Sequence, residues 1–454
     1  MGSHVAVLAF PFASHPSVLL HLVEKLAPAS PNVKFSFFST NVSNQKLCSR
    51  FKLLQGHNNF KSYDVDDGTP EGCVFTGNPL EPIGFFLDAT PDNFKKRIAE
   101  VEEETGLKIS CLLVDAFLGF SADFAHELGI PWLAFWTAGP RSLSVHIYTD
   151  EINRALASAG GEGGQSDQDM ALDFLPGMEA IHVSDLPYEL LEGHLDKPFP
   201  KMLYNMIQAI PRATAVVINS FEGMDTTVVN DLRSKLEKVL TIGPLVLPSQ
   251  KLEDELGCLS WLDSRETASV AYISFGTFLR PPPDELLALA EAIEEKQIPY
   301  LWSFRNDPKN PLLDGFLERT NGIGKVVPWT PQLNVLAHSS IGVFVTHCGW
   351  SSVMEGVACG VPMICRPFFG DQKLNRRVIE DVWQIGVGIE GGVFTKKGMV
   401  NALDLVYSSE NGSNKMRCKL NELKENAMKA VDENGSSSEN FKTLLDIVTS
   451  RDVS

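Results

Sequence analysis

Short apolar segments alternate with stretches of helical periodicity along almost the whole chain, and this alternation is the feature that most constrains the fold. Candidate strands in the first half fall at residues 5–10, 34–39, 111–115, 132–136 and 215–219. Those in the second half fall at residues 270–275, 300–304, 325–329, 341–346 and 362–366. Strands that alternate with helices are typical of parallel sheets covered by helices on both faces. The sequence therefore predicts an α/β protein built from two facing, doubly wound, Rossmann-like domains.

A stretch with two prolines and mixed polar residues separates the two sets of candidate strands. It covers residues 244–257 and is typical of a linker, so we expect one domain over residues 1–243 and another over residues 258–435. Apolar residues at helical spacing near the end of the chain predict a final helix. We expect this segment, residues 436–454, to pack back against the first domain. Residues 158–169, rich in Gly and Asp, predict a surface loop.

Composition excludes several classes of protein. The chain has 454 residues and a formal net charge of −18, which argues against a nucleic-acid partner because binding a polyanion requires clustered Lys and Arg. We find no segment long and apolar enough for a membrane span and no signal peptide. The eight cysteines lack paired spacing, which is typical of reduced thiols. We therefore expect a cytoplasmic protein, and any binding of an anionic ligand must depend on local structure.

The segment HCGWSSVMEG, which begins at His347, joins a predicted strand to a predicted helix. From Trp350 onward the apolar residues recur at i, i+3, i+4, i+7 and i+8, so one stripe of the helix is expected to be buried and Ser352 to lie off that stripe. Gly349 marks the tight turn. Such a turn directs free backbone N–H groups and a partial positive charge at one point, which favours phosphate binding. Nearby hydroxyls and His347 would add donors, and Glu355 could accept hydrogen bonds from ribose hydroxyls.

Three other readings of this segment are possible when it is taken alone. A metal site is disfavoured because two adjacent residues cannot both chelate comfortably from a buried strand end, and no Cys-x-x-Cys or His-x-x-x-His partner accompanies them. A nucleophilic Cys348 is disfavoured because a small buried thiol is the common state of cysteine. A strand-to-helix turn without any ligand stays open.

A candidate general base lies in the first half. His15 follows the first predicted strand and precedes a helix, so it is expected at the carboxyl edge of the sheet, where ligands bind in such folds. Asp115 closes another predicted strand and should emerge at the same edge. A carboxylate beside the imidazole would fix its tautomer and stabilise the imidazolium that forms on proton transfer. From spacing alone, a loop histidine and a turn-capping aspartate are the favoured interpretation.

The 44 residues from Trp329 to Gln372 resemble the nucleotide-sugar signature of plant UDP-dependent glycosyltransferases, since they open with Trp-x-Pro-Gln and close with Asp-Gln. The resemblance extends to HVAVLAFPF at residues 4–12, FWTAGP at residues 135–140 and ISFGT at residues 273–277. It is strongest to the flavonoid 3-O-glucosyltransferases. This likeness implies the GT-B fold, with an acceptor-binding first domain and a UDP-sugar-binding second domain.

The resemblance also implies a set of donor contacts. Trp329 would stack under the uracil with Gln332 beside it, because an indole face offers a large contact area at low entropic cost. Glu355 would hold the ribose, and Asp371 and Gln372 the sugar hydroxyls. The remaining donor residues implied by the resemblance are His347, Ser352, Thr277 and Ser274 at the phosphates, together with Trp350, Ser351 and Thr137. Ser351 is a departure, because the family usually has Asn there. A terminal Gln in this signature usually accompanies glucose, so UDP-glucose is the expected donor.

For the reaction, the resemblance implies that His15 is the base and Asp115 its partner in an inverting displacement, with no metal. The acceptor, a flavonol or anthocyanidin modified at its 3-hydroxyl, would contact Phe117, His146, Leu80, Pro187 and Phe369. We expect a monomer that binds no nucleic acid. Two rivals stay open. A dinucleotide oxidoreductase would need Gly-x-Gly-x-x-Gly after a strand, and we expect none, since residues 5–10 run into Pro11. A binding-only homologue would keep the fold without turnover.

Overall fold

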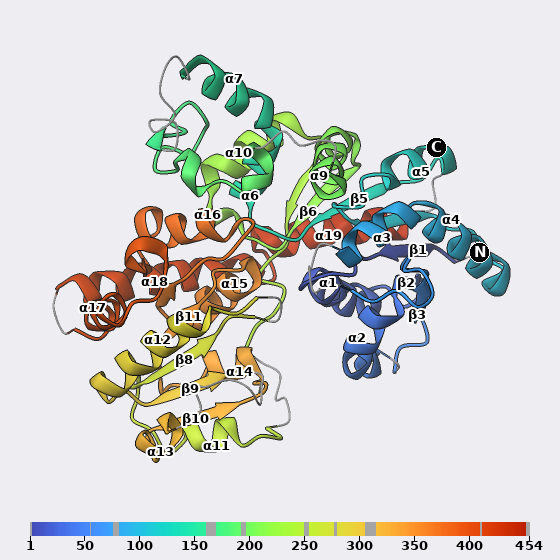
Figure 1. Cartoon of the computed structure of the whole chain (residues 1–454). Helices are drawn as coiled ribbons and strands as arrows, with labels where there is room; N and C mark the ends of the chain where they lie inside the picture. The colour runs from blue at the N-terminus through green and yellow to red at the C-terminus, as the bar shows by residue number, and fades with distance from the viewer. Residues whose placement is uncertain are drawn as a thin grey trace. The chain divides into compact units, whose positions relative to one another are not determined.

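The structure, a computed structural model, describes residues 2–54, 56–75, 81–159, 169–191, 197–248, 254–276, 279–304, 315–408 and 411–450. These residues form two compact units (Figure 1). Unit 1 comprises Met1–Glu151, Glu189–Leu245 and Ala430–Ser454, and unit 2 comprises Ile152–Tyr188 and Val246–Lys429. The domain boundaries expected from the sequence, with a linker at residues 244–257, remain a proposal that is separate from these two units. Among the described helices, none combines the length and hydrophobicity that crossing a bilayer requires.

Unit 1 is built on a parallel sheet of seven strands in the order β3-β2-β1-β4-β5-β6-β7. Its strands are β1 (His4–Leu8), β2 (Lys34–Thr40), β3 (Phe60–Val65), β4 (Cys111–Asp115), β5 (Trp132–Trp136), β6 (Ala215–Ile218) and β7 (Val239–Thr241). Its helices are α1 (His15–Ala29), α2 (Asn41–Leu54), α3 (Glu81–Ala89), α4 (Asp92–Thr105), α5 (Ser121–Leu128), α6 (Pro140–Ile147), α9 (Pro198–Ala209), α10 (Thr226–Lys235) and α19 (Ser436–Thr449). The strand order reverses between β1 and β4, where Leu8 pairs with Val114.

Unit 2 contains a parallel sheet of six strands in the order β10-β9-β8-β11-β12-β13. Its strands are β8 (Val270–Ser274), β9 (Tyr300–Ser303), β10 (Gly324–Val327), β11 (Ile341–Thr346), β12 (Met363–Cys365) and β13 (Gly386–Gly388). Its helices are α11 (Cys258–Leu262), α12 (Pro283–Lys296), α13 (Phe316–Arg319), α14 (Gln332–Leu336), α15 (Trp350–Cys359), α16 (Gln372–Arg377) and α17 (Lys396–Tyr407), with the short helices η2 (Val183–Asp185), η6 (Val378–Val382) and η7 (Glu390–Gly392). Helices α7 (Thr149–Ala159), α8 (Tyr188–Leu191) and α18 (Asn411–Val431) cross the unit boundaries. The strand order reverses between β8 and β11, where Ser274 pairs with Thr346.

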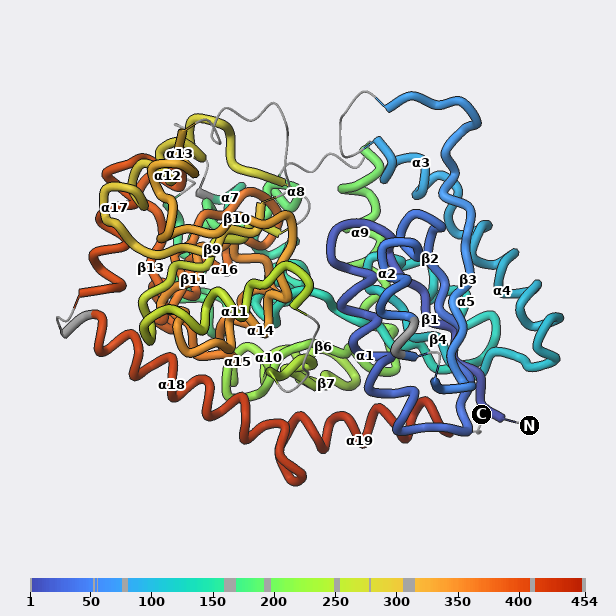
Figure 2. Tube along the Cα trace, turned by 90° about the horizontal axis from the view of Figure 1, so that it is seen from below, coloured from blue at the N-terminus to red at the C-terminus, as the bar shows by residue number. Residues whose placement is uncertain are grey.

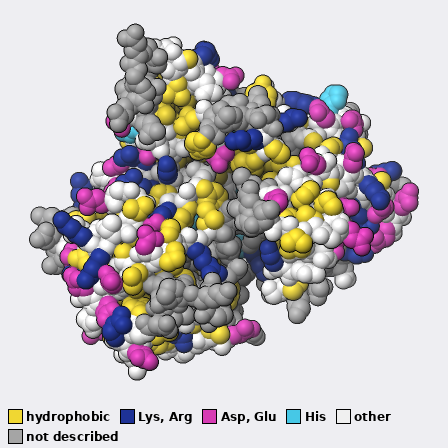
Figure 3. Space-filling model, in the orientation of Figure 1, with side chains coloured by type: hydrophobic (Ala, Val, Ile, Leu, Met, Phe, Trp, Pro, Cys, Tyr) yellow, Lys and Arg dark blue, Asp and Glu magenta, His cyan; other side chains and the backbone are white. Residues whose placement is uncertain are grey.

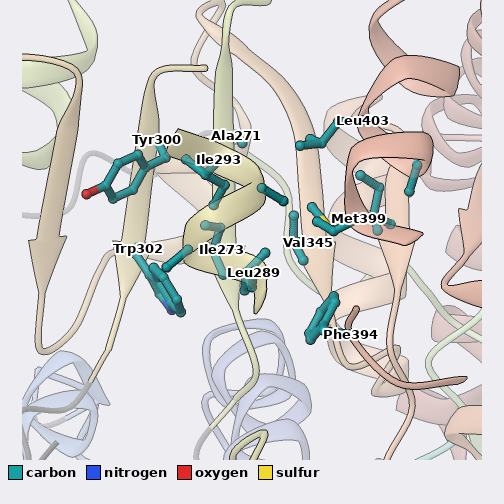
Figure 4. Packing of buried hydrophobic residues seen from close by; sticks show 14 of the residues in the cluster. Ala271, Ile273, Leu289, Ile293, Tyr300, Trp302, Val345, Phe394, Met399 and Leu403 are labelled. Atoms are coloured by element: carbon teal, nitrogen blue, oxygen red, sulfur yellow. The ribbon is translucent and has the colours of Figure 1, made fainter. Parts of the chain in front are cut away.

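The core of unit 2 shows why the alternating sequence folds as layers (Figure 4). Helix α12 has buried apolar residues at helical spacing, among them Leu289 and Ile293, which pack against sheet residues such as Ile273. Met399 and Leu403 of α17 join the same cluster. Complete burial of a side chain of this size contributes about 1.5–3 kcal/mol, so a few such contacts fix each helix on the sheet.

The last helix, α19, packs against β7 in unit 1. Ser437 donates a hydrogen bond to the carbonyl of Gly243 (2.7 Å), and Asn440 donates one to the carbonyl of Thr241 (2.9 Å). The first strand and the last helix lie close together in this unit (Figure 2), since the Ser3 hydroxyl donates to the carbonyl of Thr449. The predicted final helix is therefore confirmed.

All ten predicted strands are confirmed to within two residues at each end. The strand predicted at residues 325–329 ends at Val327, because Pro328 cannot donate to a sheet ladder. Three strands were missed: β3, β7 and β13. The polar residues of β3 alternate with buried ones, β7 has three residues, and β13 reads Gly-Val-Gly, so none carries the apolar run that marked the other strands. Most of the loop predicted at residues 158–169 lies outside the described residues.

Candidate active site

A histidine and an aspartate meet at the reversal of the unit 1 strand order. β1 leads through a short loop into α1, whose first residue is His15, and neighbouring β4 ends at Asp115. The Nδ1 atom of His15 lies 2.8 Å from Oδ2 of Asp115. The Asp115 side chain is fully buried, whereas 15% of the His15 side chain is exposed. The sequence prediction that these two residues, 100 positions apart, lie together is therefore confirmed.

The surroundings of the dyad fix its orientation. The backbone N–H of Phe117 donates to Oδ1 of Asp115 (3.0 Å), which leaves Oδ2 facing the imidazole. Rings of Phe10 and Phe117 pack on His15 at centroid distances of 5.3 Å and 4.6 Å. An ionised carboxylate can only accept hydrogen bonds, so Nδ1 carries the proton and Nε2 keeps a free lone pair. The arrangement is suited to removing a proton from a bound molecule at Nε2.

Thr137 lies in unit 1, beside the His15–Asp115 pair. It follows β5, and its hydroxyl lies 3.3 Å from Nδ1 of His15. The resemblance implied a donor contact for Thr137, and that role stays a prediction. The observed contact adds a structural task, because a hydroxyl beside Nδ1 helps to hold the ring plane.

The turn between β11 and α15 has the geometry expected of a phosphate cradle. Cys348 adopts a positive φ of 65°, and Gly349 precedes the first helical residue with no side-chain cap. A Cβ atom at Gly349 would lie 2.5 Å from the imidazole of His347, and one at Gly276 would lie 3.0 Å from it, so only glycine fits at either position. Helix α15 thus begins without a side-chain cap, and the N-terminus of such a helix is a place where backbone N–H groups can bind an anion.

Burial lowers the pKa of His347 to about 4, so its imidazole is neutral at neutral pH. Its Nδ1 atom is buried and has no hydrogen-bond partner among the described residues. The neutral ring can donate one hydrogen bond to a ligand, whereas the charge for holding an anion must come from the helix. On the face shown in Figure 3, Lys and Arg side chains are interspersed with Asp and Glu side chains, which also favours a local rather than a global attraction.

The thiol interpretation of this turn finds no support. The Cys348 side chain is fully buried, and burial raises the pKa of its thiol well above the ordinary value, which is typical of an inert cysteine. Among the residues that the structure describes, no group of three or more His, Cys, Asp or Glu side chains is placed to hold a metal ion.

Trp329 and Gln332 differ in how they are presented. Trp329 lies beyond the end of β10, and 57% of it is exposed, which is unusual for the largest apolar side chain and suits a stacking surface. The Gln332 amide instead joins α14 to α15, since it donates to the Ser352 hydroxyl (3.1 Å) and to the Glu355 carboxylate. The hydroxyl of Tyr272, which sequence reasoning missed, donates to Gln332 in turn (3.0 Å).

This network corrects one prediction for α15. The apolar stripe is buried as expected, but Ser352, predicted to lie off the stripe, is also buried at 6% exposure. The reason is its contact with Gln332, which draws the hydroxyl into the interface between α14 and α15. Ser351 is partly exposed at the helix start, and Trp350 is buried with its ring 6.4 Å from that of Trp383. Ser274 ends β8 and is buried at the same sheet edge.

The loop before α16 carries the two residues expected to hold the sugar. Gln372, the first residue of α16, is buried, and its Oε1 accepts from the backbone N–H groups of Phe368 (2.8 Å) and Phe369 (3.3 Å). Asn375 donates both to Asp371 and to the carbonyl of Cys348, each at 2.9 Å. The loop is thereby tied to the turn at the start of α15.

A buried ion pair that the sequence did not reveal holds the start of this loop. Nε of Arg366 donates to Glu285 (2.9 Å), and Nη1 donates to the carbonyl of Pro367 (2.7 Å). The same Glu285 accepts from the backbone N–H of Phe394 (2.8 Å). The sequence could have drawn attention to Arg366, because it directly follows a buried strand. It could not identify the partner Glu285, which lies 81 positions away.

The predicted acceptor residues are found in different surroundings. Phe117 contacts His15, and Phe369 is 38% exposed in the loop before α16. His146 is instead buried beside Trp136, its Nδ1 hydrogen-bonds the carbonyl of Ser142 (2.6 Å), and burial lowers its pKa to about 4. Pro187 is buried between η2 and α8 in unit 2. Two predicted site residues, Leu80 and Thr277, lie outside the described residues.

Residues 386–391 read GVGIEG, which matches the Gly-x-Gly-x-x-Gly dinucleotide motif letter for letter. Its first two glycines lie within edge strand β13 instead of in a turn between a strand and a helix. A Cβ at Gly386 would lie 2.5 Å from the carbonyl oxygen of Met363, so this glycine serves the packing of the sheet. The segment lacks the context that dinucleotide binding requires.

Comparison with known proteins defines the class. Residues 246–433 match the family model described as UDP-glucoronosyl and UDP-glucosyl transferase. A flavonol 3-O-glucosyltransferase of Actinidia chinensis var. chinensis is 51% identical over 98% of this chain and 96% of its own. An anthocyanidin 3-O-galactosyltransferase of the same organism is 49% identical over 98% and 97%. The chain therefore belongs to the UDP-dependent glycosyltransferases, as the resemblance predicted.

A solved structure agrees with this assignment. The crystal structure of a UDP-glucose: anthocyanidin 3-O-glucosyltransferase in complex with UDP matches with a TM-score of 0.90, 42% sequence identity and 99% coverage of both chains. The prediction of two parallel-sheet α/β domains in the GT-B arrangement of elements is thereby confirmed.

Proposed function

We propose that this protein transfers glucose from UDP-glucose to the 3-hydroxyl of a flavonol or anthocyanidin, with inversion at the anomeric carbon. The observation that carries the proposal is the His15–Asp115 pair at 2.8 Å, which leaves Nε2 of the imidazole as a proton acceptor at a ligand-binding sheet edge. The choice of acceptor is supported by the relatives, which are named as 3-O-glycosyltransferases of flavonols and anthocyanidins.

The proposed step is a single displacement. Nε2 of His15 takes the proton of the acceptor hydroxyl while the hydroxyl oxygen forms a bond to the anomeric carbon. The bond between that carbon and the phosphate oxygen breaks, and UDP departs with the electron pair. Asp115 stabilises the imidazolium that results, since its carboxylate already accepts from Nδ1. The sugar is inverted because the hydroxyl attacks opposite the leaving group.

The donor is held by unit 2 in this proposal. Trp329 stacks on the uracil, and Glu355 accepts hydrogen bonds from the ribose hydroxyls. The Gln332 amide holds the carboxylate of Glu355 in place by donating a hydrogen bond to it. His347, Ser351, Ser352, Ser274 and Thr277 surround the phosphates at the N-terminus of α15. The helix supplies the positive end of its dipole to the departing UDP, so we propose that no metal ion is required.

The sugar and acceptor contacts complete the proposal. Asp371 and Gln372 bind sugar hydroxyls, with the Nε2 amide of Gln372 facing the sugar because Oε1 is occupied by backbone N–H groups. Trp350 and Thr137 assist in donor recognition. The acceptor contacts are Phe117, His146, Leu80, Pro187 and Phe369. We further propose that the enzyme is a cytoplasmic monomer.

A second candidate is transfer of another sugar, and it rests on the galactosyltransferase that is nearly as similar as the glucosyltransferase. The test is a panel of UDP-glucose, UDP-galactose and UDP-rhamnose against flavonols, anthocyanidins and simple phenols, with each product located by its regiochemistry. We expect the highest kcat/KM for UDP-glucose with a flavonol or anthocyanidin. Preference for UDP-galactose would support the second candidate. Absence of UDP release with every pair would support a binding-only homologue and refute the proposal.

A further inference from the structure

The segment that carries Pro187 belongs to the same compact unit as the sugar-binding loop, although in sequence it lies within the first half of the chain. This segment, Ile152–Tyr188, includes η2, and η2 packs against α16. Helix α16 begins at Gln372, which we propose binds the sugar, and ends at Arg377. One short helix therefore connects the sugar-binding residues to the segment expected to line the acceptor.

An ion pair makes this connection. Nε of Arg377 donates to Oδ2 of Asp185 at 2.9 Å, and Asp185 is buried at 4% exposure. The same oxygen accepts from the backbone N–H of His182 (3.1 Å), so Asp185 also closes the turn that starts η2. A second nitrogen of Arg377, Nη1, donates to the more exposed Asp381 (2.8 Å).

The geometry favours a positioning role. A charge-assisted hydrogen bond to a buried carboxylate such as Asp185 is stronger than a neutral one, whereas an exposed ion pair such as that with Asp381 contributes little. Asp185 is followed directly by Leu186, buried Pro187 and Tyr188, which is 63% exposed. Because α16 is a rigid helix of six residues, the place of this segment relative to Gln372 depends on the pair at its far end.

We propose that the Arg377–Asp185 pair is a positioning device that sets where the acceptor lies relative to the donor sugar, and so which hydroxyl of a polyhydroxylated phenolic is glycosylated. The inference rests on the proposed function, since it assigns the segment around Pro187 to the acceptor. Neither residue touches a reacting atom. Their effect reaches the reaction through the segment that Asp185 anchors.

The test compares Arg377→Gln, Arg377→Lys and Asp185→Asn with the matched control Asp381→Asn, all in the full chain. The control removes the other partner of Arg377 and leaves the bond to Asp185 in place. We expect Arg377→Gln and Asp185→Asn to raise the KM for a flavonol by about fivefold or more and to increase the share of products other than the 3-O-glucoside. The KM for UDP-glucose and the affinity for UDP should stay within about twofold of wild type. Arg377→Lys should restore part of the regiochemistry, and Asp381→Asn should match wild type.

Three outcomes would overturn the inference. The first is a wild-type flavonol KM and product distribution in both Arg377→Gln and Asp185→Asn. The second is a parallel rise of both KM values, which a general loss of structure would cause. The third is an equal effect of Asp381→Asn. If wild type itself forms no glucoside, the proposed function has failed instead. Flavonol affinity, measured by fluorescence quenching for the same variants, then still decides whether the pair positions the acceptor.

Discussion

Replacement of Asp115 by Asn tests the dyad more sharply than removal of His15, because it changes charge without changing shape. The amide oxygen of Asn can keep the hydrogen bond from the N–H of Phe117, so the local backbone is preserved. The amide nitrogen then faces Nδ1 of His15, at a position now 2.8 Å away, and it can only donate. Nδ1 must accept, the ring proton moves to Nε2, and the proposed base is lost.

The size of the effect follows from the geometry. An imidazolium and a carboxylate whose charge centres are about 4 Å apart attract each other by about 4 kcal/mol at an effective dielectric constant of about 20. Asp115 is fully buried, so solvent screening does not reduce this value much. Since about 1.4 kcal/mol corresponds to a factor of ten, loss of the charge should lower kcat by about a thousandfold. The change of tautomer acts in the same direction.

The assay is steady-state release of UDP from UDP-glucose with a saturating flavonol, with His15→Ala as the reference for complete loss of the base. We expect Asp115→Asn to approach the rate of His15→Ala while the KM for UDP-glucose and the melting temperature stay close to wild type. A kcat for Asp115→Asn within about tenfold of wild type would refute the dyad reasoning, because general-base catalysis alone contributes about a hundredfold or more.

Four further predictions follow from the site and its supports. Trp329→Ala should weaken UDP binding by about 10–100-fold, the value of one stacked base, and an unchanged dissociation constant by calorimetry would remove the stacking claim. Ser351→Asn restores the residue that the family usually carries; it should tighten UDP binding about threefold through one added hydrogen bond, and weaker binding would contradict this. Glu285→Gln leaves the buried charge of Arg366 uncompensated, so urea unfolding should show a loss of about 3 kcal/mol, and a loss below about 1 kcal/mol would show that the pair is unimportant. Burial lowers the pKa of His146 from 6.5 to about 4, so between these pH values the unfolded chain binds a proton that the folded chain does not. The free energy of unfolding should therefore fall as the pH falls through that window, and this fall should be smaller by up to about 3 kcal/mol in His146→Gln. An identical pH dependence of both proteins would contradict the pKa shift.

Much of the fold could be predicted because buried parallel strands leave near-continuous apolar runs. Strands β4, β5 and β11 were predicted to the residue for this reason. Edge strand β13 consists of Gly-Val-Gly and gives no such run, so it was missed. The meeting of His15 with Asp115 could also be predicted, since parallel strands bring their carboxyl ends to one edge.

The supports of the site could not be predicted, because their partners are distant in sequence and follow no period. Tyr272 reaches Gln332 across 60 positions, and Arg377 reaches Asp185 across 192. The burial of Ser352 depends on its hydrogen bond with Gln332. The Arg377–Asp185 pair occurs where residues 152–188 belong to unit 2. Periodicity identifies which face of an element is buried, but pairings between polar side chains require coordinates.

The most direct test of the account is the NMR spectrum of the product formed from UDP-glucose and a flavonol. A single displacement by a hydroxyl activated at His15 inverts the α-linked sugar of the donor, so the account predicts a β-linked glucose on the 3-oxygen, with the large coupling between H1 and H2 that two axial protons give. An α-linked product, with the small coupling of an axial and an equatorial proton, would contradict direct attack by the acceptor and with it the role assigned to the His15–Asp115 pair.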